Sequence, residues 1–259
     1  MSRKSARTKK KMANKLVKNN ETKVTNKPVE DVVENTNTNE STGTNYLVTA
    51  GDGSCYVYFD TEFTTLSKNS ELISIGLVDS DGRTFYAEFN DYNEKKVNDW
   101  VFENVYKNLD YPDTILEGNN WTITGTKAEV RTQLMLWLDK FVSKNKPVQF
   151  VSDVCHYDFV LLVDLLTGGA TAMDLPKWVV PCCLDLNQDI STTLYRNIPE
   201  GVTEEEFNKN YIPLATAFDI NREECVKDLT GFDEPVKKHN ALYDAKVIRA
   251  IHRHIWNIK

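Results

Sequence analysis

Two carboxylates close an apolar run near residue 60. The stretch "CYVYFDTEF" (55–63) reads as a strand heading into the interior, and Asp60 and Glu62 stand at its end. Residues i and i+2 of a strand point to the same side, so both acids project together. Buried acids are costly unless something neutralises their charge. We therefore expect a cation between these two side chains.

Two further aspartates occur in similar settings. Asp158 follows the apolar "PVQFVS" segment (147–152) at the start of a helix, where a helix cap or dipole partner is the ordinary role. Asp244 lies in the first turns of the last helix, and the small Ala241 and Ala245 beside it indicate close packing. Carboxylate oxygens suit hard cations such as Mg²⁺ or Mn²⁺. Two such ions about 4 Å apart are the usual arrangement for in-line attack on a phosphodiester.

A histidine precedes the last of these acids. His239 lies five residues before Asp244, at the head of the same helix. A single histidine is usually structural, but its near-neutral unperturbed pKa also suits it to take a proton from a metal-bound water. We interpret His239 as a candidate general base.

The elements that must position these residues follow from hydrophobic periodicity. Five strands are expected, which predicts an α/β fold with a mixed five-stranded sheet and helices on both faces. Asp81-Gly82 marks a hairpin turn, Gly168 a helix end, and Pro181 an edge strand. The strands are expected at 55–60, within 71–89 (two), at 147–152 and at 177–186, and the helices at 97–109, 127–144, 157–169 and 239–258. Between them, residues 187–235 read as an irregular insertion with one short helix near 203–210.

Charge divides the chain into two unlike parts. The net charge is −7, yet residues 1–27 carry +9 and residues 28–259 carry −16. Residues 1–48 read as a disordered arm, basic and then Asn/Thr-rich, and residues 49–259 as one domain. No apolar run is long enough for a membrane span, and the N-terminus lacks a secretory core. Five unevenly spaced cysteines fit a reducing compartment, so we expect a cytoplasmic protein, in the host cytoplasm if phage-encoded.

Three short motifs together resemble a known family. In order, "FDTEF" (59–63), "HYDFVLL" (156–162) and "HNALYDA" (239–245) are similar to the three exonuclease motifs of the DEDDh 3′–5′ exonucleases. The first motif and its surroundings resemble the small bacterial and phage exoribonucleases related to RNase T, including a mycobacterial type. The resemblance covers about residues 55–90, 148–166 and 236–255, and it implies an RNase H-like fold.

The resemblance also implies roles. Asp60, Glu62 and Asp244 would hold the metal that carries the attacking water, with Glu62 and His239 as catalytic residues. Asp60 would bridge to a second metal that Asp158 supports. Thr61 and Phe63 would meet the terminal nucleotide.

One departure concerns the second motif. Many members of the family place a His-Asn pair shortly before its aspartate, whereas this chain reads "SDVCHYD" (152–158). Asp153 is therefore an alternative ligand, but the helix after Asp158 fits the motif better.

Several readings of function stay open. The leading hypothesis is a metal-dependent 3′–5′ exonuclease that releases nucleoside monophosphates from short single strands or 3′ overhangs of RNA. A DNA exonuclease acting on single-stranded DNA, an RNase H-type endonuclease and a catalytically weak nucleic-acid-binding module are the alternatives. The negative net charge of residues 28–259 argues against a long, positively charged groove that would bind many phosphates of a nucleic acid. We expect no membrane partner, and a homodimer is left open.

Overall fold

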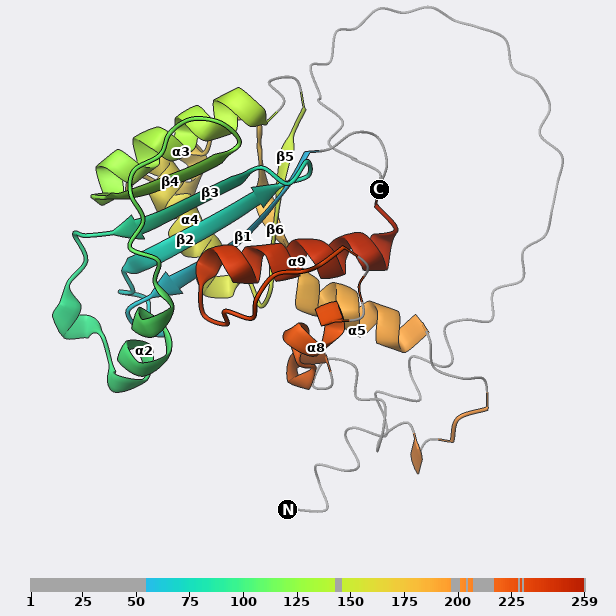
Figure 1. Cartoon of the computed structure of the whole chain (residues 1–259). Helices are drawn as coiled ribbons and strands as arrows, with labels where there is room; N and C mark the ends of the chain where they lie inside the picture. Colours follow the sequence, from blue (N-terminus) through green and yellow to red (C-terminus); the bar gives the residue numbers. More distant parts are fainter. Residues whose placement is uncertain are drawn as a thin grey trace, which may run out of the picture. The chain divides into compact units, whose positions relative to one another are not determined.

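A six-stranded sheet in the order β4-β3-β2-β1-β5-β6 forms the centre of the fold (Figure 1). The computed structural model describes residues 55–142, 146–196, 201–203, 205–206, 217–227, 229 and 231–258, so the predicted arm (1–48) lies outside the described residues. β1 pairs antiparallel with β2 and parallel with β5, and the β2–β3 pair is antiparallel while β3–β4 and β5–β6 are parallel. The strands are β1 (Cys55–Phe63), β2 (Leu72–Asp79), β3 (Thr84–Phe89), β4 (Asn120–Gly125), β5 (Val148–Ser152) and β6 (Val179–Asp185).

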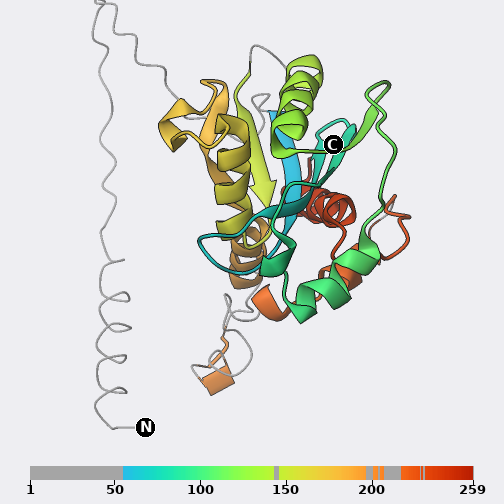
Figure 2. The same ribbon diagram turned by 90° about the vertical axis from the view of Figure 1, so that its left-hand side faces the viewer.

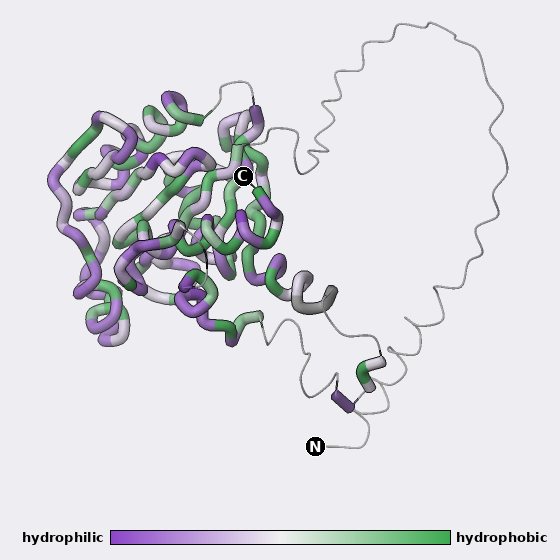
Figure 3. Tube along the Cα trace, turned by 45° about the vertical axis from the view of Figure 1, so that its right-hand side comes forward, coloured by the Kyte–Doolittle hydropathy of each residue, from purple (hydrophilic) through white to green (hydrophobic). Residues whose placement is uncertain are grey.

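Helices cover both faces of the sheet, as predicted. α3 (Lys127–Phe141) and α4 (His156–Thr167) pack on one face, and α9 (Ala241–Trp256) crosses β1 and β2 on the other. Figure 2 shows α4 and α9 on opposite sides of the strands. Because both faces are covered, every residue of β2 and β3 is buried. In Figure 3 the hydrophobic segments accordingly run through the interior of the described part and the hydrophilic ones form the outer loops.

The predicted fold class is confirmed, with one strand more than expected. β4 was not predicted; it adds Trp121 and Ile123 to the core beside β3. The helix expected at 97–109 is shorter, because α2 (Asp99–Asn104) gives way to a 3₁₀ turn at Tyr106–Asn108. Gly168 ends α4 in the left-handed conformation, with φ 68°, as its position predicted. None of the helices in the described ranges is long and apolar enough to cross a membrane.

The segment 187–235 is more regular than the sequence indicated. α5 (Leu186–Arg196) and α8 (Arg222–Lys227) were not predicted, and both pack against α9. Leu186, Ile190 and Val226 give these helices an apolar side that joins the core around α9. Of the short helix expected near 203–210, residues 203, 205 and 206 are described, and residues 205–206 are helical.

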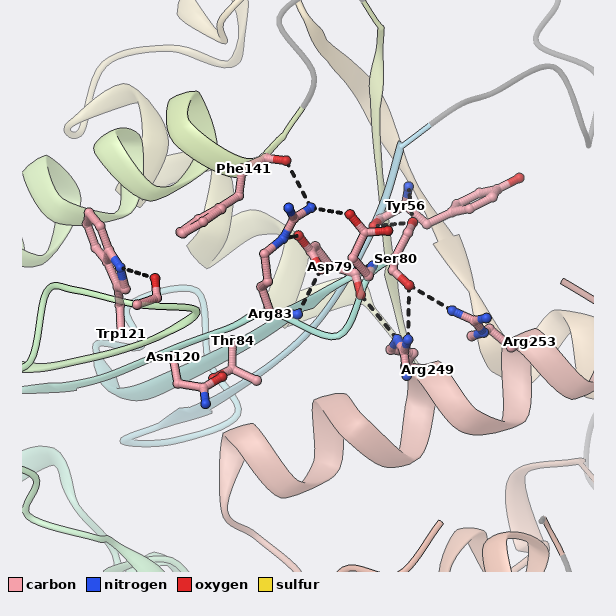
Figure 4. Close-up of polar contacts among 12 residues, drawn as sticks. Tyr56, Asp79, Ser80, Arg83, Thr84, Asn120, Trp121, Phe141, Arg249 and Arg253 are labelled. Atoms are coloured by element: carbon pink, nitrogen blue, oxygen red, sulfur yellow. Dashed lines mark hydrogen bonds and ion pairs between the residues drawn. The ribbon is translucent and has the colours of Figure 1, made fainter. Parts of the chain in front are cut away.

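The far end of α9 is held by the turn between β2 and β3 (Figure 4). Arg249 donates from Nε to the carbonyl oxygen of Asp79 at 3.1 Å and from Nη2 to that of Ser80 at 2.9 Å. Arg253 donates to the same Ser80 oxygen at 2.7 Å. These bonds fix α9 along its axis, so its first turn meets the sheet at a defined place.

Candidate active site

The end of β1 carries two of the predicted acids on the face that α9 covers. Asp60 is opposite Gly76 of β2 and Glu62 is opposite Ser74, and the register shifts immediately after Glu62. Such an irregularity bends a strand and re-aims its side chains, and it is common beside active sites. Glu62 is 9% exposed and Asp60 is half-buried. The alternation argument thus placed both acids correctly on one side.

Asp244 approaches these acids from the first turn of α9. The side chain of Asn240 caps the helix by accepting from the backbone N–H of Tyr243 at 3.1 Å. One carboxylate oxygen of Asp244 accepts from the backbone N–H of His239 at 2.9 Å. The start of α9 therefore orients the side chain of Asp244. Within the described part of the chain, no hydrogen bond engages its other carboxylate oxygen, which is available to a metal ion.

Asp158 reaches the same place from α4, on the opposite face of the sheet. Its Oδ1 accepts from the backbone N–H of Thr61 at 3.0 Å and from the Thr61 hydroxyl at 2.6 Å. Asp158 is not the N-cap of α4, because Cys155 occupies that position. Thr61 is 4% exposed and positions Asp158 through both donors. Its predicted contact with a nucleotide stays a prediction.

His239 lies beside Glu62, and its side chain is more exposed than that of Glu62. Its backbone is left-handed, with φ 63°, which is uncommon for a residue with a side chain. Its Nδ1 lies 3.9 Å from Oε1 of Glu62, and the ring meets that of Trp100 edge-on at 5.0 Å between centroids. Burial, and then the charge of Lys238, lowers the pKa of His239, so its imidazole is neutral near pH 7.

Burial and neighbouring carboxylates raise the pKa values of these four acids. Burial, followed by the charges of Asp158, Asp244, Glu62 and Asp153, raises the pKa of Asp60 well above its ordinary value. Burial raises the pKa of Asp158 to about 6 and that of Asp244 to about 7, and the pKa of Glu62 is raised well above its ordinary value by burial and then by Asp244. An acid cluster of this kind is stabilised when cations replace the protons.

A metal ion fits the donor set. Ligand atoms of Glu62, His239 and Asp244 all lie within 4.8 Å of one another. Carboxylate oxygens with one imidazole suit Mn²⁺ as well as Mg²⁺. Asp60 and Oδ2 of Asp158, the oxygen that Thr61 does not contact, add further carboxylate oxygens to the group.

A pocket of about 610 Å³ opens over the acids, and two elements form its walls. One wall is α2 with its preceding residues, where Trp100 is 54% exposed. The other is the segment 218–223, where Phe218 is 65% exposed. Phe63 also lines the pocket, and its ring lies 5.8 Å from that of Tyr157. The wall residues are Asn98, Trp100 and Val101 on one side and Phe218, Ile220, Asn221, Arg222 and Glu223 on the other.

Arg222 was not singled out from the sequence, yet it organises the second wall. It donates to both carboxylate oxygens of Asp153, at 2.7 and 3.1 Å, and also to the side chain of Asn187. Its Nη1 donates to the carbonyl oxygens of Ala217 and Ile220. Asp153 also lines the pocket, but its carboxylate is engaged by a guanidinium, whereas Asp158 accepts its hydrogen bonds from Thr61. No local motif marks Arg222; only its contact with Asp153 in the fold identifies it.

Comparison with known proteins supports the resemblance in sequence and fold. A 3′–5′ exoribonuclease of Mycobacterium tuberculosis, known from two strains, is 31% identical to this chain over 118 residues, which are 45% of this chain. The match spans 63% of that relative's length. The crystal structure of cell-death related nuclease 4 matches 79% of this chain and 64% of that one, with a TM-score of 0.50 and 13% identity. No protein-family model matches the sequence. The predicted resemblance to the 3′–5′ exonucleases and the RNase H-like fold are thereby confirmed.

Proposed function

We propose that this chain is a metal-dependent 3′–5′ exonuclease that hydrolyses RNA from its 3′ end and releases nucleoside monophosphates. One observation carries the proposal: Asp60, Glu62, Asp158 and Asp244 converge on one pocket from β1, α4 and α9, and His239 lines the same pocket. The mycobacterial exoribonuclease that is 31% identical supports RNA as the substrate.

The four carboxylates would hold two divalent ions, Mg²⁺ or Mn²⁺. When bound, these ions would supply a water of lowered pKa and offset the charge of the scissile phosphate. Asp60, Glu62 and Asp244 would face the ion next to the attacking water, and Asp60 and the free oxygen of Asp158 the other. His239, neutral near pH 7, would accept the proton from the attacking water at one of its ring nitrogens.

The pocket walls support a single-stranded 3′ end as the substrate. The exposed side chains of Trp100 and Phe218 line the pocket from two different segments of the chain, and the ring of Phe63 lines it as well. Aromatic faces bind unstacked bases with little sequence preference. A strand end that enters between the two walls would present its last phosphate to the acids, so short single strands and 3′ overhangs are the proposed substrates.

The direct test is degradation of a 5′-labelled single strand in RNA and DNA form, with Mg²⁺ or Mn²⁺ and with a chelator. We expect an RNA ladder that shortens from the 3′ end, mononucleotide products, and no products with the chelator. Cutting of a circular RNA would point to an endonuclease instead. Faster cleavage of the DNA strand would favour the alternative, a 3′–5′ exodeoxyribonuclease.

The cytoplasmic location and the homodimer stay predictions. Light scattering of the purified protein tests the dimer, and fractionation of the source cells tests the location.

A further inference from the structure

The segment that carries His239 is held by a loop far away in sequence. Asn108 donates from Nδ2 to the carbonyl oxygen of Lys238 at 2.7 Å. Asn240 donates from its own Nδ2 to the carbonyl oxygen of Asn108 at 2.8 Å and to Oδ2 of Asp110 at 3.1 Å. Lys237 forms an ion pair with the same carboxylate. Both neighbours of His239 in the chain are thus hydrogen-bonded to residues 108–110.

A buried carboxylate in turn holds this loop. Oε1 of Glu88, on β3, accepts from the backbone N–H groups of Asp110 at 2.7 Å and Tyr111 at 3.0 Å. It also accepts from the hydroxyl of Tyr86 at 2.7 Å, and that hydroxyl lies 3.4 Å from Nδ2 of Asn240. Glu88 is 3% exposed and Tyr86 is 1% exposed. The path from β3 to the His239 segment therefore consists of consecutive hydrogen bonds.

Three features of this hydrogen-bond network indicate a role beyond stabilising the fold. A buried carboxylate costs stability unless its hydrogen bonds are good, and here its bonds go to an irregular loop. Tyr111 has φ 46° and His239 φ 63°, and such backbone conformations persist only where neighbouring contacts impose them. Asn240 also caps α9 through Oδ1, so one side chain joins the loop, the His239 segment and the helix that carries Asp244.

We infer that Glu88, Asp110 and Asn240 form a positioning network for His239, in which Glu88 fixes the 108–110 loop and the loop fixes the imidazole over Glu62. The inference rests on the proposed exonuclease function for its effect on turnover. None of the three residues is needed to touch substrate: they act through His239. An error of about 1 Å in such a group can lower a rate about 100-fold.

The test is a double-mutant cycle of Asp110→Ala with His239→Ala. Asp110 is exposed, so its loss spares the core. We expect Asp110→Ala to lower kcat about 10-fold or more with little change in KM, and to lower it no further once His239 is alanine. Asp113→Ala, which removes an exposed carboxylate from the same loop, is the matched control and should retain wild-type kcat. Glu88→Gln keeps an oxygen for the loop N–H groups and should retain most of kcat, whereas Glu88→Ala should not.

Independent losses that multiply in the double variant would overturn the inference. A wild-type protein without nuclease activity would instead overturn the proposed function. In that case the ring signals of the four histidines in a ¹H–¹³C NMR spectrum still test the network. Asp110→Ala should shift or broaden the His239 signal and leave those of His156, His252 and His254 in place. An unchanged His239 signal would overturn the inference without any assay of activity.

Discussion

Gly76 of β2 lies directly against the backbone of Leu242 in α9. A Cβ atom on Gly76 would be 2.3 Å from the amide nitrogen of Leu242, and no real Cβ approaches so closely. Gly76 is also the residue opposite Asp60 in the sheet. The missing side chain therefore lets the first turn of α9 settle beside Asp60, which brings Asp244 to the other acids.

Gly76→Ala is expected to displace the start of α9. The clash is with backbone, which cannot rotate away, so we expect a loss of at least about 1–3 kcal/mol in the free energy of unfolding and a marked fall in kcat. Gly125→Ala is the control, because its Cβ would meet side-chain atoms and not backbone, Oε2 of Glu129 at 3.1 Å and Cβ of Glu129 at 3.3 Å. Urea unfolding and turnover of both variants check this, and wild-type kcat in Gly76→Ala would contradict it.

The two candidate aspartates of the second motif should behave differently. Asp158→Asn removes a charge that faces the other acids and should abolish nearly all turnover. Asp153→Asn should retain much of the turnover but weaken the ion pair with Arg222, at a cost of about 1–3 kcal/mol in the free energy of unfolding. Measured kcat and urea midpoints of both variants decide the assignment, and the reverse pattern would place the site at Asp153.

Much of the site could be predicted because its chemistry follows strand and helix periodicity. Asp60 and Glu62 share a side because side chains alternate along β1, and the alanines beside Asp244 indicated the close approach that Gly76 permits. β4 was missed because its two large buried side chains, Trp121 and Ile123, form too short an alternation to stand out among asparagines and threonines.

The features of the site that the sequence did not predict depend on contacts between residues that are far apart along the chain. Arg222 meets Asp153 across 69 residues, and Asn240 meets Asp110 across 130. No local pattern encodes such pairs, because each partner alone reads as an ordinary polar surface residue. Thr61 is a further example, because its backbone N–H and its hydroxyl donate to Asp158, which lies 97 residues away in the sequence.

A buried histidine away from the site should control acid stability. His252 is 2% exposed, lies 3.3 Å from the Tyr58 hydroxyl through Nδ1 and 3.7 Å from Oδ2 of Asp189 through Nε2, and has its pKa lowered to about 4 by burial. The unfolded chain binds a proton near pH 6.5 and the folded one only near 4. The contribution of neutral His252 is therefore present above pH 6.5 and is lost as pH falls towards 4, by about 3 kcal/mol in all.

His252→Gln should remove this part of the pH dependence. The difference in the free energy of unfolding, wild type minus variant, should decrease as the pH is lowered from about 6.5 to about 4. His254→Gln, at an exposed position two residues further on, is the control and should follow the wild type. A constant difference between wild type and His252→Gln would show that His252 titrates normally.

The acid cluster should give the opposite pH dependence and a stabilising response to cations. Because the pKa values of Asp158 and Asp244 are raised to about 6 and about 7, the folded state holds protons there that the unfolded state has released. Without metal, this contribution to stability falls as pH rises from about 4 to about 7. Mg²⁺ or Mn²⁺ should raise Tm more at about pH 7.5 than at about pH 5.5, because protons compete for the carboxylates. Asp60→Asn should reduce the shift, and an equal shift at both pH values would argue against the site.

The roles of His239 and Asp244 can be separated by titrating Mn²⁺ against two variants. His239 reaches Glu62 only at 3.9 Å from Nδ1, and Asp244 holds the His239 backbone by one oxygen while the other faces the acids. We expect His239→Ala to lower kcat by about 10²–10⁴-fold, the usual contribution of a general base, with Mn²⁺ affinity close to that of the wild type. Asp244→Asn keeps an oxygen for the His239 N–H but loses a charge, so both Mn²⁺ affinity and turnover should fall.

The imidazole of His239 also lies within reach of a shared ion, since its ligand atom is within 4.8 Å of those of Glu62 and Asp244. If excess Mn²⁺ restores full kcat to His239→Ala, the histidine is a metal ligand and the general base must be sought elsewhere in the pocket.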